Sequence, residues 1–274
     1  MAPFSQLDLS GATLEQKLIL ARELRLAPAG PGPLARLGVF LAGLGRRGPR
    51  PAPALADVLP WMFPKVLPCF EYEAYTLATG RPAAEHRPLA GTFAVSLVVD
   101  LPNQDLEVGA AELRAWNADF EGLLQTARQN LLARGGGFLA AGPGRHRAEW
   151  RDGLGGGRLL LPGLLEGLAL TGDPVALLPT RDTLLLAGSE DPDSLCWALE
   201  GALHALDTDP HPLNACPLRL RNLRWEPFQV PEGHPAACLL DQIERRRFRD
   251  ERTRRDSLLG KRPAVLPEPV AVPG

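Results

Sequence analysis

Several signatures that mark common protein classes are missing from this sequence of 274 residues. No apolar run approaches the roughly 20 residues that a membrane-spanning helix requires, so we expect no membrane insertion. The first residues, MAPFSQLDLSGATLEQK, lack the basic and apolar regions of a secretory signal. Together these two absences predict a cytoplasmic protein.

Cysteine is scarce and scattered along the chain. The four residues are Cys69, Cys196, Cys216 and Cys238, so there is no CxxC motif for metal binding or redox chemistry. We expect buried free thiols in a reducing compartment. The five histidines show no HExxH or other zinc-ligand spacing, and we predict neither a metal nor another cofactor.

Motifs for covalent catalysis and for phosphate binding are absent as well. The chain has no GxSxG nucleophile turn. The glycine-rich run GLGGGRLLLP (residues 153–162) lacks both the GK[ST] of a P-loop and the GxGxxG spacing of a dinucleotide site. A flexible hairpin loop is therefore the expected structure there, and no motif identifies a catalytic residue.

The composition is that of a globular protein. Hydrophobic residues make up 45% of the chain and charged residues 23%, which is enough to build a core under a polar surface. The formal net charge is only −2, so the whole molecule has no strong field that would attract nucleic acid or an anionic membrane.

Hydrophobic periodicity predicts both strands and helices. Strands are expected at 91–101, 175–178 and 183–187, within 137–152, and, half exposed, within 217–230. Helices are expected at 107–134 with a break near Trp116–Asn117, from Pro162 onward, at 191–206 and at 238–260. Adjacent strands joined by tight turns indicate an α+β fold, with an antiparallel or mixed sheet and helices packed mainly on one face.

Shifts in composition predict four regions. Residues 1–55 read as an N-terminal helical appendage with a Pro/Gly-rich linker, and residues 56–231 read as the α+β core domain. A charged C-terminal helix follows at 232–262, and a Pro-rich tail occupies 263–274.

Three segments carry a family resemblance. They are FAVSLVVD followed by ELRAWNADFEGLLQTARQNL, then LLLPGLLEGLALTGDPVALLPTRDTLLLAGSEDPDSL, and finally DPHPLNACPLRL. As a set they resemble the YtpQ-like family, a bacterial domain of unknown function, over about Leu59 to Val230. In the first segment the similar residues are Trp116, Ala127, Asn130 and Leu131. The resemblance implies the order of the elements and supplies no activity or catalytic residues.

A short polar break separates the strands expected at 175–178 and 183–187. Its Arg181 and Asp182 are candidate ligand-binding residues, because loops often carry function. Turn chemistry is the alternative: Pro179 fixes φ, and Asp182 can accept hydrogen bonds from nearby backbone N–H groups. An enzyme hypothesis requires a pocket that gathers at least three of four scattered residues, namely Arg181, Asp182, His211 and Glu149.

The last predicted helix is rich in arginine. From Cys238 to Arg262 the chain has nine Lys or Arg and five Asp or Glu, so i,i+4 pairs such as Asp241–Arg245 and Asp250–Arg254 are expected. Because acids are interleaved and Phe248 is the lone aromatic residue, we do not expect nucleic-acid binding. The candidate residues for binding an acidic protein partner are Arg245, Arg246, Arg249 and Arg252.

The absence of site motifs, together with the charged helix, favours a non-enzymatic binding protein. An adaptor, accessory or immunity-type factor would act through protein–protein contacts with a partner that the sequence does not identify. The alternatives are an enzyme assembled from scattered polar residues and weak nucleic-acid association through residues 245–255. The sequence leaves the oligomeric state open.

Overall fold

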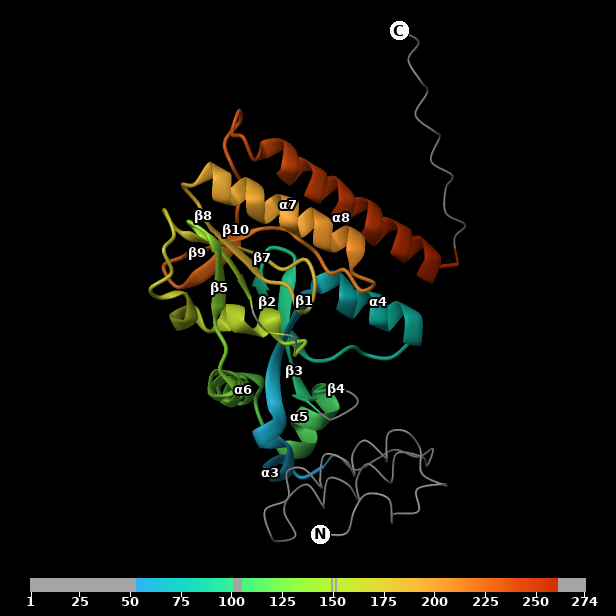
Figure 1. Ribbon diagram of the computed structural model, residues 1–274. Helices are drawn as coiled ribbons and strands as arrows, with labels where there is room; N and C mark the ends of the chain where they lie inside the picture. The colour runs from blue at the N-terminus through green and yellow to red at the C-terminus, as the bar shows by residue number, and fades with distance from the viewer. Residues whose placement is uncertain (1–52, 101–104, 149, 151, 261–274) are drawn as a thin grey trace, which may run out of the picture. The chain divides into compact units, whose positions relative to one another are not determined.

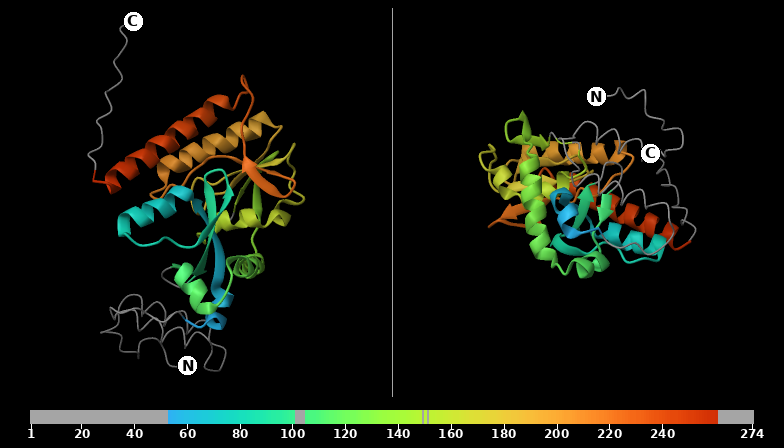
Figure 2. Two further views of the ribbon diagram at one scale, coloured as in Figure 1. Left: turned by 180° about the vertical axis from the view of Figure 1, so that it is seen from behind. Right: turned by 90° about the horizontal axis from the view of Figure 1, so that it is seen from below.

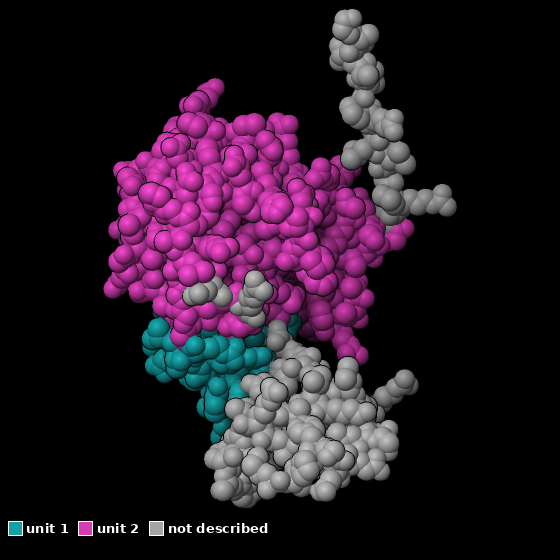
Figure 3. Space-filling view, viewed as in Figure 1, with its two compact units in different colours: residues 1–64, 96–134 teal, residues 65–95, 135–274 magenta. Residues whose placement is uncertain are grey.

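The computed structural model describes residues 53–100, 105–148, 150 and 152–260. The chain divides into two compact units (Figure 3): residues 1–64 with 96–134 form unit 1, and residues 65–95 with 135–274 form unit 2. The appendage expected within 1–55, apart from residues 53–55, and the tail expected at 263–274 lie outside the described residues. The region boundaries at 55, 231 and 262 stay predictions.

Unit 1 contains the helical region that the sequence predicts, with its break. The unit holds α3 (Leu55–Val58), η3 (Leu59–Trp61), β4 (Asp105–Glu107), α5 (Ala110–Trp116) and α6 (Phe120–Arg134). Asn117 ends α5 at φ 48°, in the left-handed region that asparagine tolerates. Asn130 of α6 donates hydrogen bonds to the Leu59 and Met62 carbonyls at 2.7 and 2.9 Å. These bonds fix α6 against η3.

A four-stranded sheet has the order β1-β3-β2, with β4 paired to β3. Its strands are β1 (Met62–Pro68), β2 (His86–Ala90) and β3 (Phe93–Asp100), besides β4. All residues from Phe93 to Val99 are buried, so both faces of β3 are covered. The helix α4 (Cys69–Thr79) begins directly after Pro68, and Gly80 ends it in the left-handed conformation.

Unit 2 is built around an antiparallel six-stranded sheet of order β10-β9-β7-β8-β6-β5 (Figure 1). The strands are β5 (Phe138–Gly142), β6 (Arg145–Ala148), β7 (Pro174–Leu177), β8 (Leu185–Gly188), β9 (Leu218–Arg221) and β10 (Arg224–Pro227). Because β7 and β8 occupy the two middle positions and are almost wholly buried, the hairpin that joins them is central and covered, as the sequence predicts.

Two long helices lie side by side over this sheet (Figures 1 and 2). They are α7 (Pro192–Thr208) and α8 (Ala237–Leu258), and they confirm the α+β class with its charged C-terminal helix. Val175, Leu177, Leu185 and Ala187 share one apolar core with Leu195 and Leu199 of α7. Ile243 of α8 is fully buried in the same core, so α8 is an integral part of unit 2.

Two sequence expectations between β6 and β10 are wrong. The helix expected from Pro162 is instead a pair of 3-10 segments, η4 (Gly155–Leu160) and η5 (Pro162–Leu165), and Gly167 at φ 83° stops further helix. The single strand expected within 217–230 is the β9–β10 hairpin. Asn222 and Leu223 have φ of 49° and 60°, as a two-residue type I′ turn requires.

The flexible loop expected for the glycine-rich run is also wrong. Gly155, Gly156 and Gly157 are buried in η4. A Cβ on Gly156 would lie 3.1 Å from the Val66 carbonyl oxygen and 2.7 Å from Leu178 Cδ2. The run therefore needs glycine for close packing of its backbone against Val66 of β1 and Leu178, which follows β7, and not for mobility.

The start of α7 yields a test by pH. Asp191 caps the helix by accepting the Ser194 N–H at 3.1 Å, and it also accepts the Ser194 hydroxyl at 2.5 Å. The hydroxyl bond first, then the backbone bonds, lower the pKa of Asp191. Because the folded pKa of Asp191 is lowered, its ionised carboxylate stabilises the folded state. This stabilisation is fully present above the unfolded pKa of about 3.9 and is lost as pH falls through the folded pKa. We expect Asp191→Ala to cost about 1 kcal/mol at pH 7 and less at pH 3, measured by urea unfolding.

Asp191→Asn is the matched control, because asparagine caps helices without titrating. We expect it to retain most of the stability, with little change between the two pH values. An Asp191→Ala cost that is the same at pH 7 and pH 3 would show that the charge of this carboxylate does not contribute.

Candidate functional site

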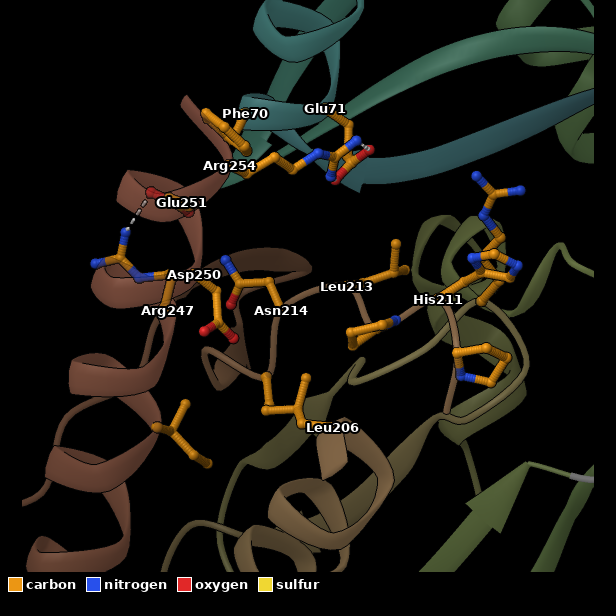
Figure 4. Close-up of a pocket in the computed structure, with 15 residues that line it drawn as sticks. Phe70, Glu71, Leu206, His211, Leu213, Asn214, Arg247, Asp250, Glu251 and Arg254 are labelled. Atoms are coloured by element: carbon orange, nitrogen blue, oxygen red, sulfur yellow. Dashed lines mark hydrogen bonds and ion pairs between the residues drawn. The ribbon is translucent and has the colours of Figure 1, made fainter. Parts of the chain in front are cut away.

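Unit 2 contains a cleft of about 500 Å³ (Figure 4). It lies between α4, α8, the end of α7, and the loop of residues 210–215. Lining residues are Phe70, Glu71, Arg181, Leu206, Pro210, His211, Pro212, Leu213, Asn214, Ala215, Ile243, Arg247, Asp250, Glu251 and Arg254. Its volume is within the range of small-molecule sites, about 300 to 1,000 Å³.

The loop wall of the cleft is held by several hydrogen bonds. Leu213 donates its N–H to the Pro179 carbonyl at 2.7 Å, which ties this loop to the turn after β7. Asn214 donates to Thr92 Oγ1 at 2.9 Å and accepts the Cys216 N–H at 2.7 Å. Because Pro210 and Pro212 also restrict φ, this wall is preorganised.

The turn of residues 179–182 explains the roles of Arg181 and Asp182. Thr180 Oγ1 makes the local turn bonds, since it accepts the Asp182 and Thr183 N–H groups at 3.3 and 3.1 Å. Asp182 instead accepts the Gly153 N–H at 2.7 Å, 29 residues away, so the expected local bonding is wrong. The Arg181 carbonyl accepts a hydrogen bond from the Gly155 N–H at 3.2 Å, and Arg181 is one of the residues that line the cleft.

The carboxylates of the cleft all have cationic partners. Arg254 of α8 forms a two-bond ion pair with Glu71 of α4, and one of its distances is 3.0 Å. Arg247 Nη1 lies 3.5 Å from Glu251 Oε2, and Arg246 Nε lies 3.3 Å from Asp250 Oδ2. Within the described part of the chain, no hydrogen bond or ion pair engages the Arg181 guanidinium. Arg181 is therefore the arginine of this cleft whose guanidinium has no partner among the described residues.

Much of the basic character of α8 is used within unit 2. Arg246 binds Asp207 and donates to the Leu206 carbonyl at 2.8 Å, where α7 ends. Arg255 forms a two-bond pair with Glu73 of α4 at 2.7 and 3.1 Å. The pair Asp241–Arg245 is as expected, at 2.6 Å, whereas the expected Asp250–Arg254 pair is replaced by Arg254–Glu71. Arg246 is thus mainly a structural residue.

The other three candidate arginines are exposed on one face of α8. Arg245, Arg249 and Arg252 have 79%, 59% and 80% of their side chains exposed. Phe248 lies on the same face and is 60% exposed. Positions 245, 248, 249 and 252 follow the i, i+3, i+4, i+7 spacing of one side of a helix. We call these four residues the arginine stripe. The ion pairs of the three arginines, with Asp241, Asp250 and Asp256, involve exposed guanidinium groups and are therefore weak.

The residues of the enzyme hypothesis are only partly brought together. Arg181 and His211 line the cleft, Asp182 does not, and Glu149 lies outside the described residues. The described residues also contain no group of three His, Cys, Asp or Glu that could hold a metal ion. All four cysteines are free, but Cys69 and Cys238 are exposed, so the expectation of burial is wrong for those two. Burial raises the pKa of Cys216, which disfavours its thiolate.

Sequence reasoning missed most of the cleft and one member of the stripe. The apolar cleft residues Phe70, Leu206 and Ile243 come from three helices far apart in the chain, and no local signal joins them. Phe248 could have been added to the stripe from its helical spacing alone. In the part of the chain that the structure describes, no helix combines the length and the apolar character needed to cross a membrane. No protein-family model, curated protein or solved structure matches the sequence.

Proposed function

We propose that this protein is a cytoplasmic binding protein that contacts an acidic protein partner through the arginine stripe. The observation that carries the proposal is that one set of α8 residues fixes the helix within unit 2 while another set remains exposed. Ile243, Arg246, Arg254 and Arg255 fix the helix to α7 and α4, whereas Arg245, Phe248, Arg249 and Arg252 remain exposed on one face. An exposed aromatic ring among guanidinium groups matches the residue types that dominate binding energy at protein interfaces.

A protein partner fits this surface better than nucleic acid. The stripe spans seven helical steps, about 10 Å, and its three arginines each lie beside an aspartate. Tight nucleic-acid binding usually neutralises several phosphates, about six to ten, which the stripe does not offer. The partner surface that fits is a groove with an apolar centre for Phe248 and carboxylates at its rim.

Site-specific photo-crosslinking in the native host tests this proposal. We would replace Phe248 by a photoreactive benzoyl-phenylalanine and, as the control, Leu132 of α6, which is 57% exposed on another helix. We expect one dominant protein adduct from position 248 and none from position 132, identified by mass spectrometry. Because both positions are exposed helical side chains, neither replacement alters a core.

Adducts of the same proteins from both positions, or no adduct from position 248, would overturn the proposal. A truncation near Val230 is a poorer test, because it removes Ile243, Leu239 and Leu240 from the core and uncovers α7. Loss of binding in that truncated chain would report unfolding as readily as a missing contact.

A further inference from the structure

We propose that the cleft between α4 and α8 binds a small carboxylic acid with an apolar body, the carboxylate pairing with Arg181. This inference concerns a surface separate from the arginine stripe and does not depend on the proposed function. It rests on three features of the cleft: one guanidinium on a fixed backbone turn, without a partner among the described residues, an apolar floor, and three carboxylates that already have partners.

The backbone that carries Arg181 is fixed before any ligand binds. Gly155 donates to the Arg181 carbonyl at 3.2 Å, Thr180 Oγ1 closes the turn, and Leu213 ties the turn to the loop of His211. The side chain of Arg181 is exposed, so its guanidinium is available to a ligand. An arginine fork matches a carboxylate through two parallel hydrogen bonds.

The floor of the cleft is apolar. Ile243 is 0% exposed, Leu206 6% and Phe70 8%, and these side chains come from α8, α7 and α4. In Figure 4, His211 and Leu213 lie on the side opposite the α8 residues Arg247, Asp250 and Glu251. An apolar body placed between these walls buries its surface against Phe70, Leu206 and Leu213.

The charges of the cleft select a monoanion. Glu71, Asp250 and Glu251 would repel a phosphate dianion, and the single unpaired guanidinium compensates about one negative charge. A cationic ligand would have to compete with the arginines that already lie beside Glu71, Asp250 and Glu251. The geometry therefore favours a carboxylate over both a phosphate and an amine.

Three matched probes test the inference by titration calorimetry and by two-dimensional amide NMR on the full chain. They are 4-phenylbutyrate, 4-phenylbutylamine and 4-phenylbutan-1-ol, which share the apolar body and differ in charge. We expect a dissociation constant on the order of 1 mM for the acid, given its size, and at least about tenfold weaker binding of the alcohol and the amine.

Variants locate the site. Arg181→Ala is expected to weaken binding of the acid at least about tenfold, since a charge-assisted hydrogen bond is lost, and Arg181→Lys to retain part of it. Arg224→Ala, at an exposed arginine of β10 that does not line the cleft, serves as the control and is expected to leave binding unchanged. Equal binding of acid and amine, no effect of Arg181→Ala, or no binding of the acid to the unaltered chain at 20-fold the expected constant, roughly 20 mM, would overturn the inference.

Discussion

Asp152→Ala is expected to destabilise the protein by about 3 kcal/mol or more, because it strands a buried guanidinium without its counter-charge. Arg158 is only 2% exposed and binds both Asp152 oxygens, at 3.0 and 2.8 Å. It also donates to the Gly135 carbonyl at 3.3 Å and stacks 4.2 Å from the centre of the Trp150 ring. Urea unfolding followed by tryptophan fluorescence measures the loss.

Asp241→Ala is the matched control, because it also removes an aspartate–arginine pair. The Asp241–Arg245 pair is 54% and 79% exposed, and exposed helical pairs of this spacing are worth about 0.3 to 0.5 kcal/mol. The double variant Asp152→Ala with Arg158→Met is expected to be more stable than Asp152→Ala alone, since it removes the stranded charge. Equal stabilities of Asp152→Ala and Asp241→Ala would contradict this account of the buried pair.

The consequence of this ion pair extends to the cleft. Asp152 and Arg158 flank the glycine-rich segment, and Gly153 and Gly155 of that segment bond to Asp182 and to the Arg181 carbonyl. The pair therefore stabilises the turn that carries Arg181 into the cleft. The two residues singled out in the sequence have distinct roles: Asp182 holds the turn through Gly153, and Arg181 is the proposed ligand-binding residue.

Elements set by local signals could be predicted from the sequence. Asp191, Pro192 and Asp193 are a helix-start pattern, and α7 begins at Pro192 as expected. The break at Asn117 and the charged helix α8 follow equally from local composition and spacing. The α+β class with a central β7–β8 hairpin was predictable because both strands are apolar and a short polar turn joins them.

Features that depend on distant contacts could not be predicted. The i,i+4 spacing on a helix predicts that Arg254 pairs with Asp250. It pairs instead with Glu71, 183 residues away in the chain, which no local pattern indicates. The glycine-rich run resembles a flexible loop until its neighbours Val66 and Leu178 are known. The cleft is a product of three helices and a proline-rich loop, and its residues share no period in the sequence.

Charge removal from the stripe has the second large expected effect. In Arg245→Gln/Arg249→Gln/Arg252→Gln, three exposed guanidinium groups are lost, while the contacts of Ile243, Arg246, Arg254 and Arg255 are retained. Because arginine is a frequent hot-spot residue, we expect affinity for the protein partner to fall by about 100-fold or more. Stability is expected to change little, since the lost ion pairs are exposed.

The central claim is that the arginine stripe binds an acidic protein partner. It is tested most directly by the affinity of the stripe variant and of a control for the protein that crosslinks at position 248, measured by surface plasmon resonance. The control is Arg81→Gln/Arg221→Gln/Arg224→Gln, which removes the same charge from three exposed arginines off α8. The account predicts about 100-fold weaker binding for the stripe variant and a change within about twofold for the control. Equal affinities of the unaltered chain, the stripe variant and the control would contradict it.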